Sequence, residues 1–329
     1  MLRLASTFSR LSYRSLSAAA VAPKTTKEAL ATLRKRTGYS YTNIRKAVDK
    51  FGPERIDEAE KWLKELAVKE GWAKAAKLGT RVASQGLLGV ETSKNAAAVV
   101  ELNCETDFVA RSDVFKHLLE EITQAVIDAG KGLAAPADKQ LASHLIEASE
   151  LLTRQNRTVK EAIAMMVGKL GENITISRAQ VFIAPSDIEV FARSHPREGT
   201  EATEMGRFVS IVGIHRKLNV TQFPTDKLAS QLCQHVIGMQ PESLGTPTQR
   251  QQSTEETQKV ADGEKDELNE FYTGKTTQMN EDETQLLRQS FMLNPSQSVY
   301  DYLQSHGAEV ISFARLELGV NNNAETQSS

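Results

Sequence analysis

The chain has 329 residues, 40% of them hydrophobic and 25% charged, with 40 basic and 42 acidic side chains. This composition is typical of folded globular proteins and excludes collagen-like and disordered chains. Only two cysteines are present, Cys104 and Cys233, far apart in the sequence, which excludes a disulfide scaffold and a zinc module. No apolar run approaches the roughly 18 residues that a membrane helix needs, so we expect no membrane partner.

The first 22 residues differ from the rest of the chain. They contain three arginines and five serines but no acidic residue. Such a composition is typical of a mitochondrial or plastid transit peptide that is later removed, and we predict one over residues 1–22. A merely disordered N-terminus is the alternative.

A basic helical module follows. Between Lys24 and Arg81, 15 basic residues face 8 acidic ones, a net charge of +7. Apolar residues recur at helical spacing in three short segments, which end at Gly38, Gly52 and Gly71. The pattern predicts a three-helix module over residues 24–75, joined to the rest of the chain by a linker over 76–82.

The remainder mixes strand and helix patterns. Residues 96–102 form a continuous apolar run suited to a buried strand, and Ser112 begins an amphipathic helix. A helix is predicted over 158–170, strands over 173–184 and 208–215, and a helix capped by Thr225. Because the strand-then-helix unit at 96–130 recurs loosely at 207–239, we predict an α+β fold with a duplicated core, subdomain 1 over 76–195 and subdomain 2 over 196–319.

One stretch within the second subdomain is polar. Residues 253–284 contain ten acidic residues and three lysines, a net charge of −7. We expect a flexible acidic connector over 241–285. A helix around 299–303 and a last strand over 310–318 follow, and residues 320–329 are expected to form a disordered tail.

Motifs of enzyme chemistry are absent from the sequence. There is no GxGxxG, HExxH or GxSxG pattern, and Gly274-Lys275-Thr276 lacks the upstream glycine and strand of a phosphate-binding loop. Cys104 follows an apolar run and is expected to be buried and inert. We therefore expect no enzyme, no metal and no cofactor.

The segment Glu101–Arg111 is the most unusual one. It leaves a buried strand and enters a helix across a short polar turn, where a rigid scaffold can present side chains outward. Two interpretations are open from the residues alone. In the first, Asp107 and Phe108 face a partner; in the second, Thr106 or Asp107 caps the helix while Phe108 packs on the core.

The same segment carries a resemblance. Asn103-Cys104-Glu105-Thr106-Asp107-Phe108-Val109-Ala110 resembles the signature of translation elongation factor Ts. Further stretches resemble the family in the same order along the chain, at residues 33–38, 72–77, 169–174, 289–292 and 310–319.

The resemblance implies a guanine nucleotide exchange factor for elongation factor Tu, with a ubiquitin-associated-like module before two similar α+β subdomains. With the arginine-rich leader, it implies the mitochondrial form, located in the matrix and acting on mitochondrial elongation factor Tu. It implies no cofactor, no direct nucleotide binding and no nucleic-acid partner.

The resemblance also implies which residues contact the partner. The exchange wedge would lie beside the magnesium and phosphate site of the GTPase and consists of Thr106, Asp107, Phe108 and Val109. The N-terminal module would contact the same GTPase domain through Arg34, Tyr41 and Thr42, although the family usually has methionines at the last two positions. His195 matches a core contact only approximately.

Two other classes remain as alternatives. The basic module contains Tyr39, Tyr41, Trp62 and Trp72, a combination compatible with an RNA- or ribosome-associated protein. Against this, Trp62 falls on the apolar face of its helix. A peptide-binding scaffold that uses only the helical module is the second alternative.

Overall fold

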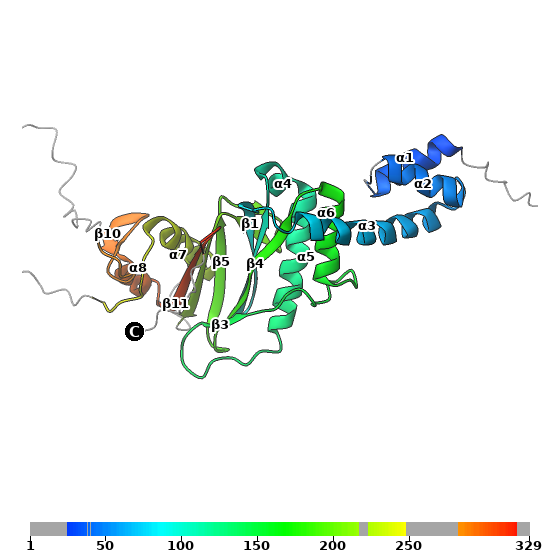
Figure 1. Ribbon diagram of the computed structural model, residues 1–329. Coiled ribbons are helices and arrows are strands. Elements are labelled where there is room, and N and C mark those ends of the chain that lie inside the picture. Colours follow the sequence, from blue (N-terminus) through cyan, green and yellow to red (C-terminus); the bar gives the residue numbers. More distant parts are fainter. Residues whose placement is uncertain (1–24, 38, 40, 217–222, 248–281, 321–329) are drawn as a thin grey trace, which may run out of the picture. The chain divides into compact units, whose positions relative to one another are not determined.

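A computed structural model of the chain describes residues 25–37, 39, 41–216, 223–247 and 282–320 (Figure 1). These residues fall into two compact units that divide within one long helix, between Leu66 and Ala67. The transit peptide expected over 1–22 and the Gly274–Thr276 motif lie outside the described residues.

The first unit is helical. It contains α1 (Thr26–Thr37), α2 (Tyr41–Phe51) and the first part of α3 (Ile56–Leu78). Gly52 ends α2 because its φ of +82° favours glycine, and its N–H donates to Val48 O at 2.8 Å. The apolar positions of the sequence pattern form the core of this unit, which contains Ala29, Leu33, Ile44, Ala47, Val48, Ile56, Ala59 and Leu63.

Helix α3 does not end at Gly71, as the sequence analysis expected, but continues to Leu78 and includes the first residues of the expected linker. The reason is tertiary packing against α6 (Val159–Leu170). A Cβ at position 71 would lie 2.0 Å from Ala164 O, and Gly168 faces Gly71 directly. Gly71 therefore permits a close helix crossing and does not terminate the helix.

The second unit begins with an antiparallel six-stranded sheet. Helices α5 (Asp113–Gly130) and α6 pack on one face of it; α5 begins at the predicted cap, Ser112, and the cap of α6 is Thr158. We call it the first sheet, and its strand order is β3 (Ala142–Leu145), β4 (Ile174–Ile183), β2 (Ala96–Cys104), β1 (Gln85–Ser93), β7 (Glu204–Gly206), β6 (Glu198–Gly199).

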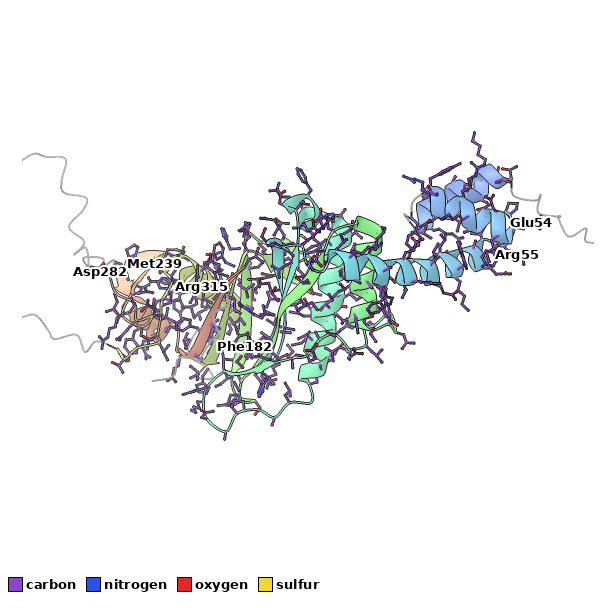
Figure 2. The ribbon with its side chains drawn as sticks, in the orientation of Figure 1. Glu54, Arg55, Phe182, Met239, Asp282 and Arg315 are labelled. Atoms are coloured by element: carbon purple, nitrogen blue, oxygen red, sulfur yellow. The ribbon has the colours of Figure 1, made fainter. Side chains whose placement is uncertain are left out.

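A second, three-stranded sheet packs on the other face of the first. Its order is β11 (Ala308–Glu317), β8 (Phe208–Arg216), β5 (Glu189–His195). The core between the sheets contains Phe182, which is labelled in Figure 2 and fully buried. Helices α7 (Thr225–Met239) and α8 (Val299–Ser305) cover the outer face of the second sheet. The unit thus has four layers, helices, sheet, sheet and helices (Figure 1).

Both sheets contain the same arrangement of two adjacent strands, a helix and a third strand that pairs with the second. In the first sheet these strands are β1, β2 and β4, and in the second they are β5, β8 and β11. The sheets do not divide the chain at residue 195, the boundary expected from the sequence. Strand β5 lies in the second sheet, whereas β6 and β7, which follow it, return to the first.

One further expectation, the cap of α7, differs from the structure. Thr225 does not cap α7; the cap residue is Pro224, and Thr225 Oγ1 accepts a hydrogen bond from Arg216 Nη1 at 2.6 Å. The acidic connector is described only at its ends, which are held together because Glu242 N–H donates to Thr284 O at 2.8 Å. Val320, the first residue of the expected tail, accepts a hydrogen bond from Arg178 through its carbonyl oxygen.

Candidate functional site

The turn after β2 leads into α4 (Asp107–Arg111), a helix of five residues that is fixed at both ends. Thr106 is its N-cap, and the Thr106 hydroxyl accepts a hydrogen bond from Val109 N–H at 3.4 Å. Ser112 donates from its N–H to Val109 O and accepts from Phe115 N–H through its hydroxyl, so it ends α4 and begins α5. Four residues of the signature are therefore held on a short, capped element.

Phe108 points away from the protein, with 81% of its surface exposed. Ala110 is buried, and Val109 packs against the core of the first sheet and its helices. Because these two residues turn one side of α4 inward, Phe108 lies on the opposite side. The prediction that Phe108 packs on the core is wrong, whereas the prediction that Thr106 caps the helix is confirmed.

Asp107 lies next to Phe108 and is also accessible. Its carboxylate forms an ion pair with Arg111 Nη2 at 3.0 Å, and 46% of the Asp107 side chain is exposed. Exposed pairs of this kind contribute at most about 1 kcal/mol. A partner can therefore take over the Asp107 carboxylate at little cost in free energy.

A reciprocal pair of carboxylates braces the turn from below. Glu172 accepts from Thr106 N–H at 3.0 Å and from the Thr106 hydroxyl at 2.6 Å. Glu105 accepts in turn from Asn173 N–H at 2.7 Å. The turn after β2 and the turn between α6 and β4 thus exchange hydrogen bonds, although they lie 66 to 68 residues apart in the sequence.

A third segment joins this brace. Arg81 Nη1 lies 3.4 Å from Glu105 Oε2, and Asn173 Nδ2 donates to Arg81 O at 2.8 Å. The connection between α3 and β1 therefore lies beside the signature. It carries Val82, an exposed apolar side chain.

The three residues expected to contact a partner from the helical unit are all exposed. Arg34 lies on α1, and Tyr41 and Thr42 begin α2. Tyr41 is a large hydrophobic side chain that is 51% exposed. Trp62, in contrast, packs partly against the core beside Phe51 and is not a free stacking surface.

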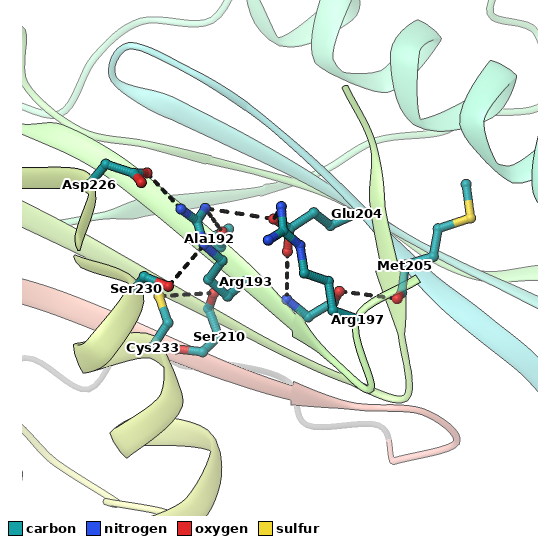
Figure 3. A network of polar contacts seen from close by, with 10 residues as sticks. Ala192, Arg193, Arg197, Glu204, Met205, Ser210, Asp226, Ser230 and Cys233 are labelled. Carbon is teal, nitrogen blue, oxygen red and sulfur yellow. Dashed lines mark hydrogen bonds and ion pairs between the residues drawn. The ribbon is translucent and has the colours of Figure 1, made fainter. Parts of the chain in front are cut away.

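His195 is exposed at the end of β5 and is joined to Pro196 by a cis peptide bond. The neighbouring Arg193 and Arg197 both approach Glu204 of β7, at 3.7 and 2.9 Å (Figure 3). The backbone of His195 also lies against Gly206, which pairs with Leu88 of β1. The second sheet thus meets the first sheet at His195, beside strand β1, which pairs with β2.

Neither cysteine is a reactive thiol. Burial raises the pKa of Cys104 and of Cys233 to about 12, so both are protonated at neutral pH.

Within the described ranges, no group of three or more His, Cys, Asp or Glu side chains is placed to hold a metal ion. None of the helices in that same part of the chain is long and apolar enough to cross a membrane.

Comparison with known proteins decides the family. The model of the family described as Elongation factor TS matches residues 105–320, about two thirds of the chain, and that of Elongation factor Ts, mitochondrial, N-terminal matches residues 13–73. The chain belongs to the elongation factor Ts family. The resemblance inferred from the motifs is therefore confirmed.

Relatives named mitochondrial elongation factor Ts match over most of their length. The Brugia malayi protein is 50% identical over 304 residues, which cover 92% of this chain and 90% of the relative. The Caenorhabditis elegans protein is 46% identical over 309 residues (94% and 96%), and the Branchiostoma floridae protein 38% identical over 306 residues (89% and 89%). This member of the elongation factor Ts family thus has relatives of similar extent.

The sequence analysis did not find the brace beneath the signature. Glu105, Glu172, Asn173 and Arg81 hold the turn but were not singled out as site residues. A signal was available, because residues 169–174 resemble a second motif of the elongation factor Ts family. The pairing of β2 with β4 could not be predicted from the sequence. This pairing brings Cys104 opposite Ile174 and so places the two motifs side by side.

Proposed function

We propose that the chain binds mitochondrial elongation factor Tu and accelerates the release of GDP from it, and thereby supports elongation in mitochondrial translation. Membership of the elongation factor Ts family supports the partner and the activity. The observation that carries the proposal is the outward-facing Phe108 on a turn fixed by two caps and a reciprocal brace. The protein acts in the mitochondrial matrix, after removal of residues 1–22.

Exchange is a coupling free energy. The factor and GDP each weaken the binding of the other to the GTPase, by the same amount at equilibrium. An acceleration of about four decades requires about 5.5 kcal/mol of differential stabilisation. One buried aromatic side chain contributes about 2 to 3 kcal/mol at an interface. Phe108 therefore needs a holding surface elsewhere on the molecule.

Phe108 inserts into the GTPase beside its magnesium and phosphate site, flanked by Thr106 and Val109. Asp107 exchanges its weak pair with Arg111 for polar groups that hold magnesium or phosphate. The chain makes and breaks no covalent bond and needs neither a cofactor nor a nucleotide site of its own. It is an exchange factor and not an enzyme in the usual sense.

Two parts of the molecule supply the holding surface. The three-helix unit is a ubiquitin-associated-like module that contacts the GTPase through Arg34, Tyr41 and Thr42. The core consists of two similar α+β subdomains, one around each sheet, and the second contributes His195. The equivalent strand orders of the two sheets support this division of the core.

The test is release of a fluorescent GDP from mitochondrial elongation factor Tu, with a chain that begins near Ala22. We expect a dose-dependent acceleration that Phe108→Ala reduces at least tenfold. Leu145→Ala is the matched control, since Leu145 is 79% exposed but lies on the edge strand β3. Full acceleration by Phe108→Ala would contradict the wedge. No acceleration by the unaltered chain, together with salt-dependent RNA binding, would favour the RNA-associated alternative.

The net charge of +7 between Lys24 and Arg81 predicts electrostatic steering toward an acidic partner surface. We expect the association rate with the GTPase to fall severalfold as the salt concentration rises from 50 to 300 mM, because screening shortens the Debye length to below about 10 Å. Stopped-flow fluorescence measures this rate. An association rate that does not depend on salt would remove steering from the mechanism.

A further inference from the structure

We propose that Glu172 is a positioning residue of the exchange reaction, which holds α4 so that Phe108 faces the partner. The inference rests on the proposed function. Glu172 touches neither Phe108 nor Asp107 through a hydrogen bond. Its carboxylate acts through Thr106, the residue that caps α4.

The Thr106 hydroxyl connects Glu172 to the helix. This hydroxyl has one proton, which it donates to Glu172 Oε1 at 2.6 Å. Its lone pairs are then directed toward Val109 N–H, the group that the cap must satisfy. Removal of the carboxylate frees the hydroxyl to rotate and leaves Thr106 N–H without its acceptor, so the first turn of α4 loses its fixed orientation.

The location of Glu172 is not explained by stability of its own helix. It follows Gly171, which ends α6 in the left-handed conformation at φ +80°. A carboxylate just past a helix C-terminus opposes the helix dipole, whereas one at an N-terminus complements it. Among the described residues, α4 is the helix whose N-cap residue, Thr106, donates hydrogen bonds to this carboxylate. The negative charge of Glu172 thus stabilises the signature turn and does not stabilise α6.

The reciprocal bond from Asn173 N–H to Glu105 makes the arrangement rigid. Two turns that each donate to and accept from the other cannot slide without breaking charge-assisted bonds of 2.7 and 3.0 Å. Arg81 neutralises Glu105 from the other side. Phe108 therefore stands on a frame built from three segments, and preorganisation of this kind reduces the ordering cost of binding.

The experiment measures GDP release from mitochondrial elongation factor Tu as a function of factor concentration, for Glu172→Gln and for the control Glu161→Gln. Glu161 is the matched control because its carboxylate also accepts a hydrogen bond from a backbone N–H, that of Thr158. This bond lies at the start of α6, whereas Glu172 follows the end of α6. We expect Glu172→Gln to lower the maximal release rate about tenfold, with less than a threefold change in the half-saturating concentration. Glu161→Gln should keep the maximal rate.

A substitution at Thr106 completes the test. Thr106→Val removes the hydroxyl that links Glu172 to Val109 N–H and should lower the maximal rate as Glu172→Gln does. Hydrogen exchange of the amides of residues 107–111 gives a readout that is independent of the partner. We expect the protection of Val109 and Ala110 to fall at least tenfold in Glu172→Gln and to stay unchanged in Glu161→Gln.

The outcomes separate the two proposals. If the unaltered chain fails to accelerate GDP release, the proposed function is wrong, and hydrogen exchange still decides whether Glu172 holds α4. Unchanged protection of residues 107–111 in Glu172→Gln overturns the inference. So does a maximal rate equal to that of the unaltered chain, or an equal loss in the two glutamine variants, since Glu172 would then serve only the stability of the fold.

Discussion

Phe108 is a large apolar side chain that the fold leaves exposed to solvent. We expect it to matter for GDP release but to contribute little to the stability of the fold. We expect Phe108→Ala to change the free energy of unfolding by less than about 0.5 kcal/mol, because little of its surface is buried. Phe115→Ala, at a fully buried position seven residues later, should cost about 3 to 5 kcal/mol. Urea unfolding measures both. A large destabilisation by Phe108→Ala would mean that the side chain packs on the core.

His235 provides the second prediction at the scale of single residues. It is fully buried on α7, accepts from Met292 N–H at Nδ1 and lies 3.0 Å from Gln289 Oε1 through Nε2. Burial lowers its pKa from 6.5 to about 4. Between these values the unfolded chain binds a proton that the folded chain does not, so stability falls as the pH falls from 6.5 toward 4, by about 3 kcal/mol in total.

Urea unfolding at pH 7 and pH 4.5 tests this prediction. His235→Gln should show a smaller loss of stability between the two pH values than the unaltered chain does. His117→Gln is the control, because His117 is 75% exposed and should leave the pH dependence unchanged. Equal pH dependence in the unaltered chain and His235→Gln would assign the acid sensitivity to other groups.

Some of these residue roles could be predicted from the sequence and others could not. The caps at Thr106 and Ser112 follow from local hydrogen bonding, which a short segment determines by itself. The direction of Phe108 depends on which side of a five-residue helix packs inward, and that is set by the core beneath it. The brace by Glu172 depends on a contact across 66 residues, which the resemblance suggested only as a second motif.

Among the elements, the crossing of α3 and α6 is the most sensitive to a small change. A methyl group at position 71 would lie 2.0 Å from Ala164 O, a backbone atom that cannot rotate away. We expect Gly71→Ala to cost at least about 3 kcal/mol by forcing the helices apart. Gly132→Ala is the control, since its nearest atom would be 3.9 Å away. Urea unfolding compares them, and equal stability would show that the crossing can relax.

The elements also show why prediction of their ends succeeded in part. Gly52 ends α2 because its backbone is in the left-handed region, a property that local sequence can indicate. Gly71 is also a glycine, but it is needed for the close crossing of α3 and α6, so α3 continues through this position. Strands β5, β6 and β7 gave no clear pattern, since two of them are only two or three residues long and their sheet membership is decided by pairing with distant strands.

At the scale of the whole molecule, a buried charge pair in the first sheet also binds the C-terminal end of the last strand. Glu101 of β2 and Arg178 of β4 are 2% and 7% exposed, with 3.6 Å between Oε2 and Nη2. Gly319 N–H donates to Glu101 Oε1 at 3.0 Å, a contact between residues 218 positions apart. The end of the last strand is thus tied to the strand that leads into the signature turn.

Breaking this pair on one side should be worse than replacing both partners. Arg178→Met leaves Glu101 as an uncompensated buried charge and should cost about 3 to 5 kcal/mol, whereas the double variant with Glu101→Leu should recover part of that loss. The exposed pair of Arg55 and Glu58 is the control, because Arg55→Met should cost less than about 1 kcal/mol. Urea unfolding of the single and double variants measures the coupling. Additive losses would contradict an energetic coupling between Glu101 and Arg178, and the last strand would then be held by its pairing with β8 and its apolar contacts.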